Sequence, residues 1–157
     1  MAARRVYATL MPPLFEVRVE SSFEAGHRRG PDGEQTPLHH HVWQVAARAR
    51  SLGLDHIGIV IDFRILRAAL DEVLETLDQR VLEDLDPFAD TPPTPPAVAA
   101  WIFEQLHEHL AAAGVAVKAG EVGEDGEAGR DGDETAPWLE AVEVEADPGT
   151  RFETRRG

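Results

Sequence analysis

Three histidines, His27, His39 and His41, have the types and spacing that could hold a metal ion. His39 and His41 are two residues apart, so in a β-strand both side chains point to the same face. His27 ends an earlier predicted strand, where an antiparallel partner would lie opposite them. Imidazole is a common zinc ligand, and catalytic zinc usually takes three protein ligands and keeps one open position. The spacing predicts a Zn²⁺ site, although a solvated polar cluster would give the same pattern.

The elements that must position these histidines follow from the apolar pattern of the chain. Strict alternation predicts strands over 14–22, 38–50 and 138–145, and the apolar run 58–61 predicts a hairpin partner for the second strand. Asp62 predicts the start of one helix, and Thr94 followed by two prolines predicts a second helix that stops at Gly114. A further strand is expected to begin over 115–118. This order predicts an α+β sandwich built on an antiparallel sheet.

Composition limits the remaining possibilities. The chain has 157 residues, and 15 Lys+Arg against 29 Asp+Glu give a net charge of −14, which argues against nucleic acid or an anionic membrane as partner. With no cysteine, disulfides, iron–sulfur clusters and thiol nucleophiles are excluded. We expect a cytoplasmic protein with an N-terminal tail over 1–13 and a single domain over 14–157. The Gly-rich acidic segment 118–137 is expected to be a mobile loop.

Six stretches, taken together and in this order, resemble the family of 6-pyruvoyl- and 6-carboxy-tetrahydropterin synthases. They are SFEAGH (22–27), LHHHVWQV (38–45), GIVIDFRILRAAL (58–70), LDQRVLEDL (77–85), PPTPPAVAAWIFEQL (92–106) and AVEVEA (141–146). The resemblance implies the tunnelling fold, or T-fold, in which a four-stranded antiparallel sheet carries two helices on one face. It also implies a homohexamer made of two stacked trimers, and zinc held by His27, His39 and His41. His40, in the place of a family glycine, is expected to face away.

The same resemblance shows where this chain departs from the family pattern. Gln35 occupies the position of a catalytic thiol, and Gln79 that of a histidine that relays protons. Neither amide titrates near neutral pH, so neither can replace the family residue. Glu34 and Asp78 are the remaining candidates for acid–base catalysis, although Asp78 is equally expected to be a structural polar residue at the end of a helix.

A third departure is Ala146, which stands where the family has a glutamate that anchors the pterin. Glu145 or Asp147 could replace that glutamate only if the strand register slips by one residue. We therefore expect a zinc-binding homologue whose lyase-like activity acts on a pterin or a related small metabolite, without the ordinary synthase reaction. The alternative is a non-catalytic homologue that binds zinc or a pterin.

Overall fold

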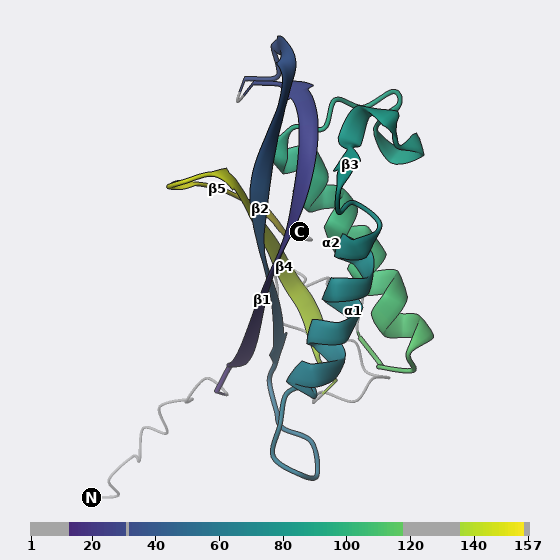
Figure 1. Ribbon diagram of the computed structural model, residues 1–157. Helices are drawn as coiled ribbons and strands as arrows, with labels where there is room; N and C mark the ends of the chain where they lie inside the picture. Colours follow the sequence, from purple (N-terminus) through teal and green to yellow (C-terminus); the bar gives the residue numbers. More distant parts are fainter. Residues whose placement is uncertain (1–12, 31, 118–135, 156–157) are drawn as a thin grey trace, which may run out of the picture.

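A single mixed sheet with two helices on one face forms the domain (Figure 1). The computed structural model describes residues 13–30, 32–117 and 136–155. The strands are β1 (Phe15–Arg29), β2 (Gln35–Ser51), β3 (Arg80–Val81), β4 (Trp138–Asp147) and β5 (Thr150–Arg155). Their order in the sheet is β3-β1-β2-β4-β5, and every pairing except that of the two-residue β3 with β1 is antiparallel.

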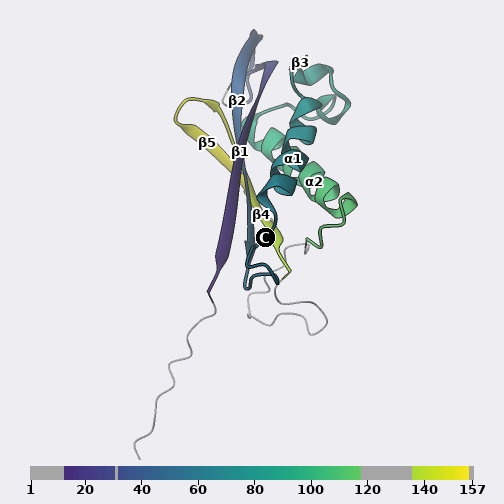
Figure 2. The same ribbon diagram turned by 60° about the horizontal axis from the view of Figure 1, so that its bottom comes forward.

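The helices α1 (Phe63–Glu75) and α2 (Pro95–Ala112) lie side by side against the same face of the sheet (Figures 1 and 2). The core lies between the two layers, where alternate strand residues meet one stripe of each helix. Its largest fully buried side chains are Trp43, Phe103, Leu66, Leu70, Leu77, Leu82, Ile102, Leu106, Leu110 and Leu139. The predicted α+β fold with two helices on one face is confirmed. No helix in the described part of the chain is both long enough and apolar enough to cross a bilayer.

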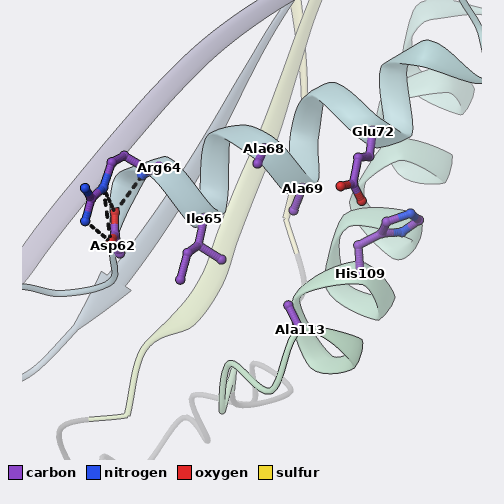
Figure 3. A pocket seen from close by; sticks show the side chains of 8 residues that line it. All are labelled: Asp62, Arg64, Ile65, Ala68, Ala69, Glu72, His109 and Ala113. Atoms are coloured by element: carbon purple, nitrogen blue, oxygen red, sulfur yellow. Dashed lines mark hydrogen bonds and ion pairs between the residues drawn. The ribbon is translucent and has the colours of Figure 1, made fainter.

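The predicted helix starts are correct. Asp62 caps α1, because its side chain accepts a hydrogen bond from the backbone N–H of Arg64 at 2.9 Å (Figure 3). The Arg64 side chain also pairs with this carboxylate, and these bonds lower the pKa of Asp62 to about 2.

Pro95 and Pro96 occupy the first turn of α2, where a missing N–H costs nothing. α2 ends before Gly114, whose φ of 75° lets the chain turn away.

The helix-free face of the sheet is charged, and this fixes the strand register. Arg50 on β2 lies 2.7 Å from Glu16 on β1 and 2.9 Å from Glu140 on β4. Arg18 on β1 reaches Glu143 on β4 at 3.2 Å. Slipping a strand by one residue would turn these charges into the core, so the alternation specifies one register. That register sets which residues of β1 and β2 lie opposite each other.

Two strand predictions were wrong, and one long strand was missed. Residues 58–61 form no strand, because Asp55 Oδ1 accepts the backbone N–H groups of Ile57 and Ile59 at 2.9 and 3.1 Å and folds this segment into a turn. Residues 115–117 also lie outside any strand. The fourth long strand of the sheet is instead β5, which was not predicted. The expected tail 1–13 and acidic loop 118–137 fall almost entirely outside the described residues.

Candidate metal centre

The β1–β2 pairing brings the three predicted histidines together. His27 lies directly opposite His39, and His41 lies opposite Ala25, two residues along β1. One ligand atom from each histidine lies within 4.8 Å of the others, and the ring centroids are 4.5 to 5.1 Å apart. This is the one group of three or more His, Asp, Glu or Cys residues in the described chain that could hold a metal ion.

A buried tryptophan supports the histidines from the core side. The indole ring of Trp43 contacts those of His27 and His41 edge-on, with centroids 5.1 and 6.1 Å away. Trp43 is fully buried, and its Nε1–H donates to the Ala25 carbonyl at 3.2 Å. Since Trp43 follows His41 by two residues on the same face of β2, this strand holds the core residue together with two of the three histidines, His39 and His41.

Backbone carbonyls fix the orientation of two of the rings. His27 Nδ1 lies 3.3 Å from the Pro93 carbonyl, and His39 Nδ1 lies 2.8 Å from that of Pro37. A carbonyl oxygen only accepts hydrogen bonds, so each Nδ1 carries the proton and each Nε2 keeps a lone pair. His27 is 3% exposed, and its Nε2 is buried with no hydrogen-bond partner in the described chain. An unpaired buried acceptor is costly, and a metal ion would satisfy it.

The surroundings of two of the three rings, His27 and His41, favour their neutral form. Burial lowers the pKa of His27, and the neighbouring His39 and His41 lower it further. Burial also lowers the pKa of His41, which outweighs the opposite effect of the Asp147 carboxylate. Only neutral imidazole can bind a metal, so burial favours the metal-binding form of His27 and His41.

The histidines open into a hollow of about 450 Å³ that also contains one of the two predicted acid–base residues. Glu34 lines this hollow, with its carboxylate packed against Gly30 and its Oε2 accepting the Asp32 backbone N–H at 3.1 Å. A Cβ at Gly30 would collide with that carboxylate, so the glycine leaves room for this position of the Glu34 side chain.

Asp78 lies elsewhere and makes a structural contact. It is not among the described residues that line the hollow, and its Oδ1 accepts the backbone N–H of Glu24 on β1 at 2.8 Å. The next residue, Gln79, has a φ of 56° and donates its N–H to the Glu24 carbonyl at 2.7 Å. Both residues therefore tie the end of α1 to β1. His40 faces away from the cluster, as expected from alternation, and its ring packs over Gly26.

Two charged residues of the hollow, Arg29 and Asp147, are not among the predicted metal ligands and acid–base residues, and Asp147 was considered only as a conditional replacement for the pterin-anchoring glutamate. Arg29 donates to the Gly33 carbonyl at 3.1 Å, and Asp147 Oδ1 lies 3.4 Å from His41 Nδ1. Asp147 lines the hollow together with Ala146, and the β4–β5 register shifts at this point. The sequence did carry a signal for Asp147, since it is the acidic residue that directly follows Ala146 at the expected glutamate position.

A second hollow lies between α1 and α2, and three of its polar residues have local partners (Figure 3). Asp62 pairs with Arg64, and His109 Nδ1 lies 2.9 Å from the Gln105 carbonyl one turn earlier. Since this hollow lacks a converging set of ligands among the described residues, it does not compete with the histidine cluster as a candidate site.

A T-fold sheet with a three-histidine group at the end of its β1–β2 hairpin defines the class of protein. The chain belongs to the 6-pyruvoyl tetrahydropterin synthase family, whose model matches residues 16–130. It is 36% identical over 96 residues to a 6-carboxy-5,6,7,8-tetrahydropterin synthase of Synechocystis sp., a match that covers 57% of this chain and 72% of the relative. The predicted family resemblance is thereby confirmed.

Solved structures show the same fold at low sequence identity. The 6-pyruvoyl tetrahydropterin synthase of Caenorhabditis elegans superposes with a TM-score of 0.68 at 21% identity, covering 92% of this chain and 97% of that one. That of Plasmodium vivax gives a TM-score of 0.64 at 19% identity, covering 92% of this chain and 99% of that one.

Proposed function

We propose that this chain is a zinc-binding enzyme with lyase-like activity on a pterin or a related small metabolite. His27, His39 and His41 hold the Zn²⁺. The observation that carries the proposal is the buried Nε2 of His27, which has no partner in the described chain and lies within 4.8 Å of ligand atoms from the other two rings. When bound, zinc supplies Lewis-acid polarisation of a substrate oxygen.

Glu34 is the proposed general base. It lines the same hollow as the histidines, and the Asp32 backbone N–H holds its Oε2, so Oε1 is the atom assigned to take the substrate proton. The solved Plasmodium vivax relatives support this role, because variants with a glutamate changed to cysteine or alanine are described as catalytic residue mutants. We assign Asp78 to holding β1 through Glu24 rather than to proton transfer.

A non-catalytic homologue that binds zinc or a pterin is the second candidate. The observation favouring it is that Gln35 and Gln79 stand where the resemblance implies a thiol and an imidazole, and Ala146 where it implies a carboxylate. In this case the hollow would bind its ligand without turning it over. The two candidates share the metal site and differ only in the chemistry of Glu34.

We also propose that the protein is a cytoplasmic homohexamer. The assembly is supported by large apolar side chains that this single chain leaves exposed, among them Val42 at 55%, Ile57 at 67% and Phe63 at 60%. Burying these side chains against neighbouring subunits would remove them from water.

The test combines zinc binding with turnover. Metal-free protein is titrated with zinc and then incubated with dihydroneopterin triphosphate and a panel of other pterins, with products followed by mass spectrometry. We expect turnover by the zinc form and a loss of about 100-fold or more in Glu34→Gln, because a general base contributes about 10²–10⁴-fold. Glu72→Gln, in the hollow between the helices, is the matched control.

The possible outcomes separate the candidates. Equal turnover by Glu34→Gln and the wild type would remove Glu34 from the mechanism. Zinc and pterin binding by the wild type with no product from any pterin would favour the non-catalytic homologue. Failure of the wild type to bind zinc would overturn the zinc enzyme, and failure to bind both zinc and every pterin would overturn both candidates.

A further inference from the structure

The third ring of the metal centre, that of His41, has a different neighbour from the other two. His27 and His39 each have Nδ1 beside a backbone carbonyl, at 3.3 and 2.8 Å. The corresponding atom of His41 lies 3.4 Å from Oδ1 of Asp147. Nδ1 of each ring therefore has an oxygen within 3.4 Å, and His39 Nδ1 also lies 3.3 Å from the Thr36 hydroxyl. Among the three rings, only His41 has a carboxylate at this position.

The end of β4 is built to place this carboxylate at the hollow. The β4–β5 register shifts between Glu145 and Asp147. Glu145 is committed to the turn that follows, because it accepts the Gly149 N–H at 2.8 Å and pairs with Arg151 at 2.6 Å. Gly149 adopts a φ of 86°, a left-handed backbone conformation that glycine tolerates and that lets the chain reverse between β4 and β5. These contacts anchor the two sides of the bulge, and Asp147 is left lining the hollow beside His41.

We propose that Asp147 is a positioning residue of the metal centre, which accepts the Nδ1–H of His41 and so presents Nε2 of that ring to the ion. The inference rests on the proposed metal site and adds a residue to it. Metal-bound histidines commonly donate their second N–H to a carboxylate or a carbonyl, which fixes the tautomer and the ring orientation. Asp147 itself lies outside the group of converging ligand atoms, so we assign it no direct bond to the metal.

Two substitutions separate the hydrogen-bond acceptor from the charge. Asp147→Ala removes the acceptor, and we expect it to weaken zinc affinity about 10- to 100-fold, as for other partners of metal-bound histidines. Asp147→Asn keeps an oxygen acceptor, so we expect it to recover most of this loss. Asp90→Ala removes a carboxylate from an exposed position outside the hollow and is the charge-matched control. Affinities are measured by competition with a chromogenic chelator.

A second measurement does not depend on zinc. Long-range ¹H–¹⁵N NMR of the metal-free protein reports which ring nitrogen of His41 carries the proton. We expect Nδ1–H in the wild type and in Asp147→Asn, and a shift towards Nε2–H in Asp147→Ala.

Unchanged affinity and an unchanged tautomer in Asp147→Ala would overturn the inference and leave the metal site intact. Equal losses in the Ala and Asn variants would also overturn it, since the charge and not the acceptor would then matter. A wild type that binds no zinc would instead contradict the proposed function, while the tautomer measurement would still test the contact.

Discussion

Replacing His27 with leucine should affect the protein differently with and without metal. The side chain is 3% exposed, and its buried Nε2 has no partner in the described chain. Such a group costs about 1–3 kcal/mol of folding free energy. Leucine removes this cost, but it also removes the contact with the Pro93 carbonyl, worth about 0.5–1.5 kcal/mol, and its different shape costs less than about 1.5 kcal/mol. These effects nearly cancel.

We therefore expect metal-free His27→Leu to unfold with a free energy within about 1 kcal/mol of the wild type. Zinc changes the comparison, because a ligand at 100 times its Kd stabilises the folded state by about 2.7 kcal/mol. For a chain of this size, 1 kcal/mol shifts Tm by about 2–4 °C, so zinc should raise the Tm of the wild type by about 5–11 °C. The variant has lost a ligand and should gain little.

The assay is thermal and urea unfolding of both proteins in a chelator and in zinc. His40→Leu is the matched control, because His40 faces away from the cluster and this variant should keep the full zinc response. A loss above about 3 kcal/mol in the metal-free His27→Leu protein would show that His27 is primarily structural. A zinc response equal to that of the wild type would show that His27 is not a ligand.

Three further predictions concern pH, a helix cap and the core. Burial lowers the pKa of His27 below its usual 6.5, so the unfolded chain takes up a proton first. Metal-free wild type should therefore lose stability relative to His27→Leu as the pH falls from about 7.5 to 5.5, as measured by urea unfolding. Asp62→Ala should lower Tm while Asp62→Asn keeps most of the cap, and since the pKa of Asp62 is about 2, acid should weaken the cap only below about pH 4. Trp43→Phe should cost about 1–3 kcal/mol in urea unfolding, because the Ala25 carbonyl loses its indole donor; a cost below about 0.5 kcal/mol would contradict this.

The positions of the histidines follow from a property of strands that the sequence carries directly. Alternation places His39 and His41 on one face, and the same alternation continues through Trp43 into the core. His39 and His41 therefore lie on the face of β2 that packs against the helices. The sequence alone is enough to place them on the core side. The sequence could not show that His27 pairs with His39. That pairing follows from the β1–β2 register, which depends on charged and apolar contacts along the whole length of both strands.

The errors in the strand predictions show where the local sequence pattern is insufficient. Residues 58–61 are apolar enough for a strand, but the Asp55 side chain accepts the backbone N–H groups of Ile57 and Ile59 and folds the segment into a turn. β5 was missed because Phe152 is its only apolar side chain, so its sequence lacks the alternation of a strand. The turn at Gly149 brings β5 into its pairing with β4. The approach of Asp147 to His41 depends on this same turn, so it could not be predicted without β5.

The histidines proposed to hold the metal and the residue at the family's pterin-anchor position lie on different strand pairs. The histidines belong to β1 and β2, whose pairing is continuous up to His27 opposite His39. Ala146 and Asp147 belong to the end of β4, where the pairing with β5 is already irregular. A substitution at Ala146 changes the wall of the hollow without moving the β1–β2 register, so ligand choice can diverge while the metal centre stays. Asp147 is different, because its carboxylate lies 3.4 Å from His41 Nδ1. Asp147→Ala should therefore alter zinc affinity, whereas Glu34→Gln should alter turnover alone.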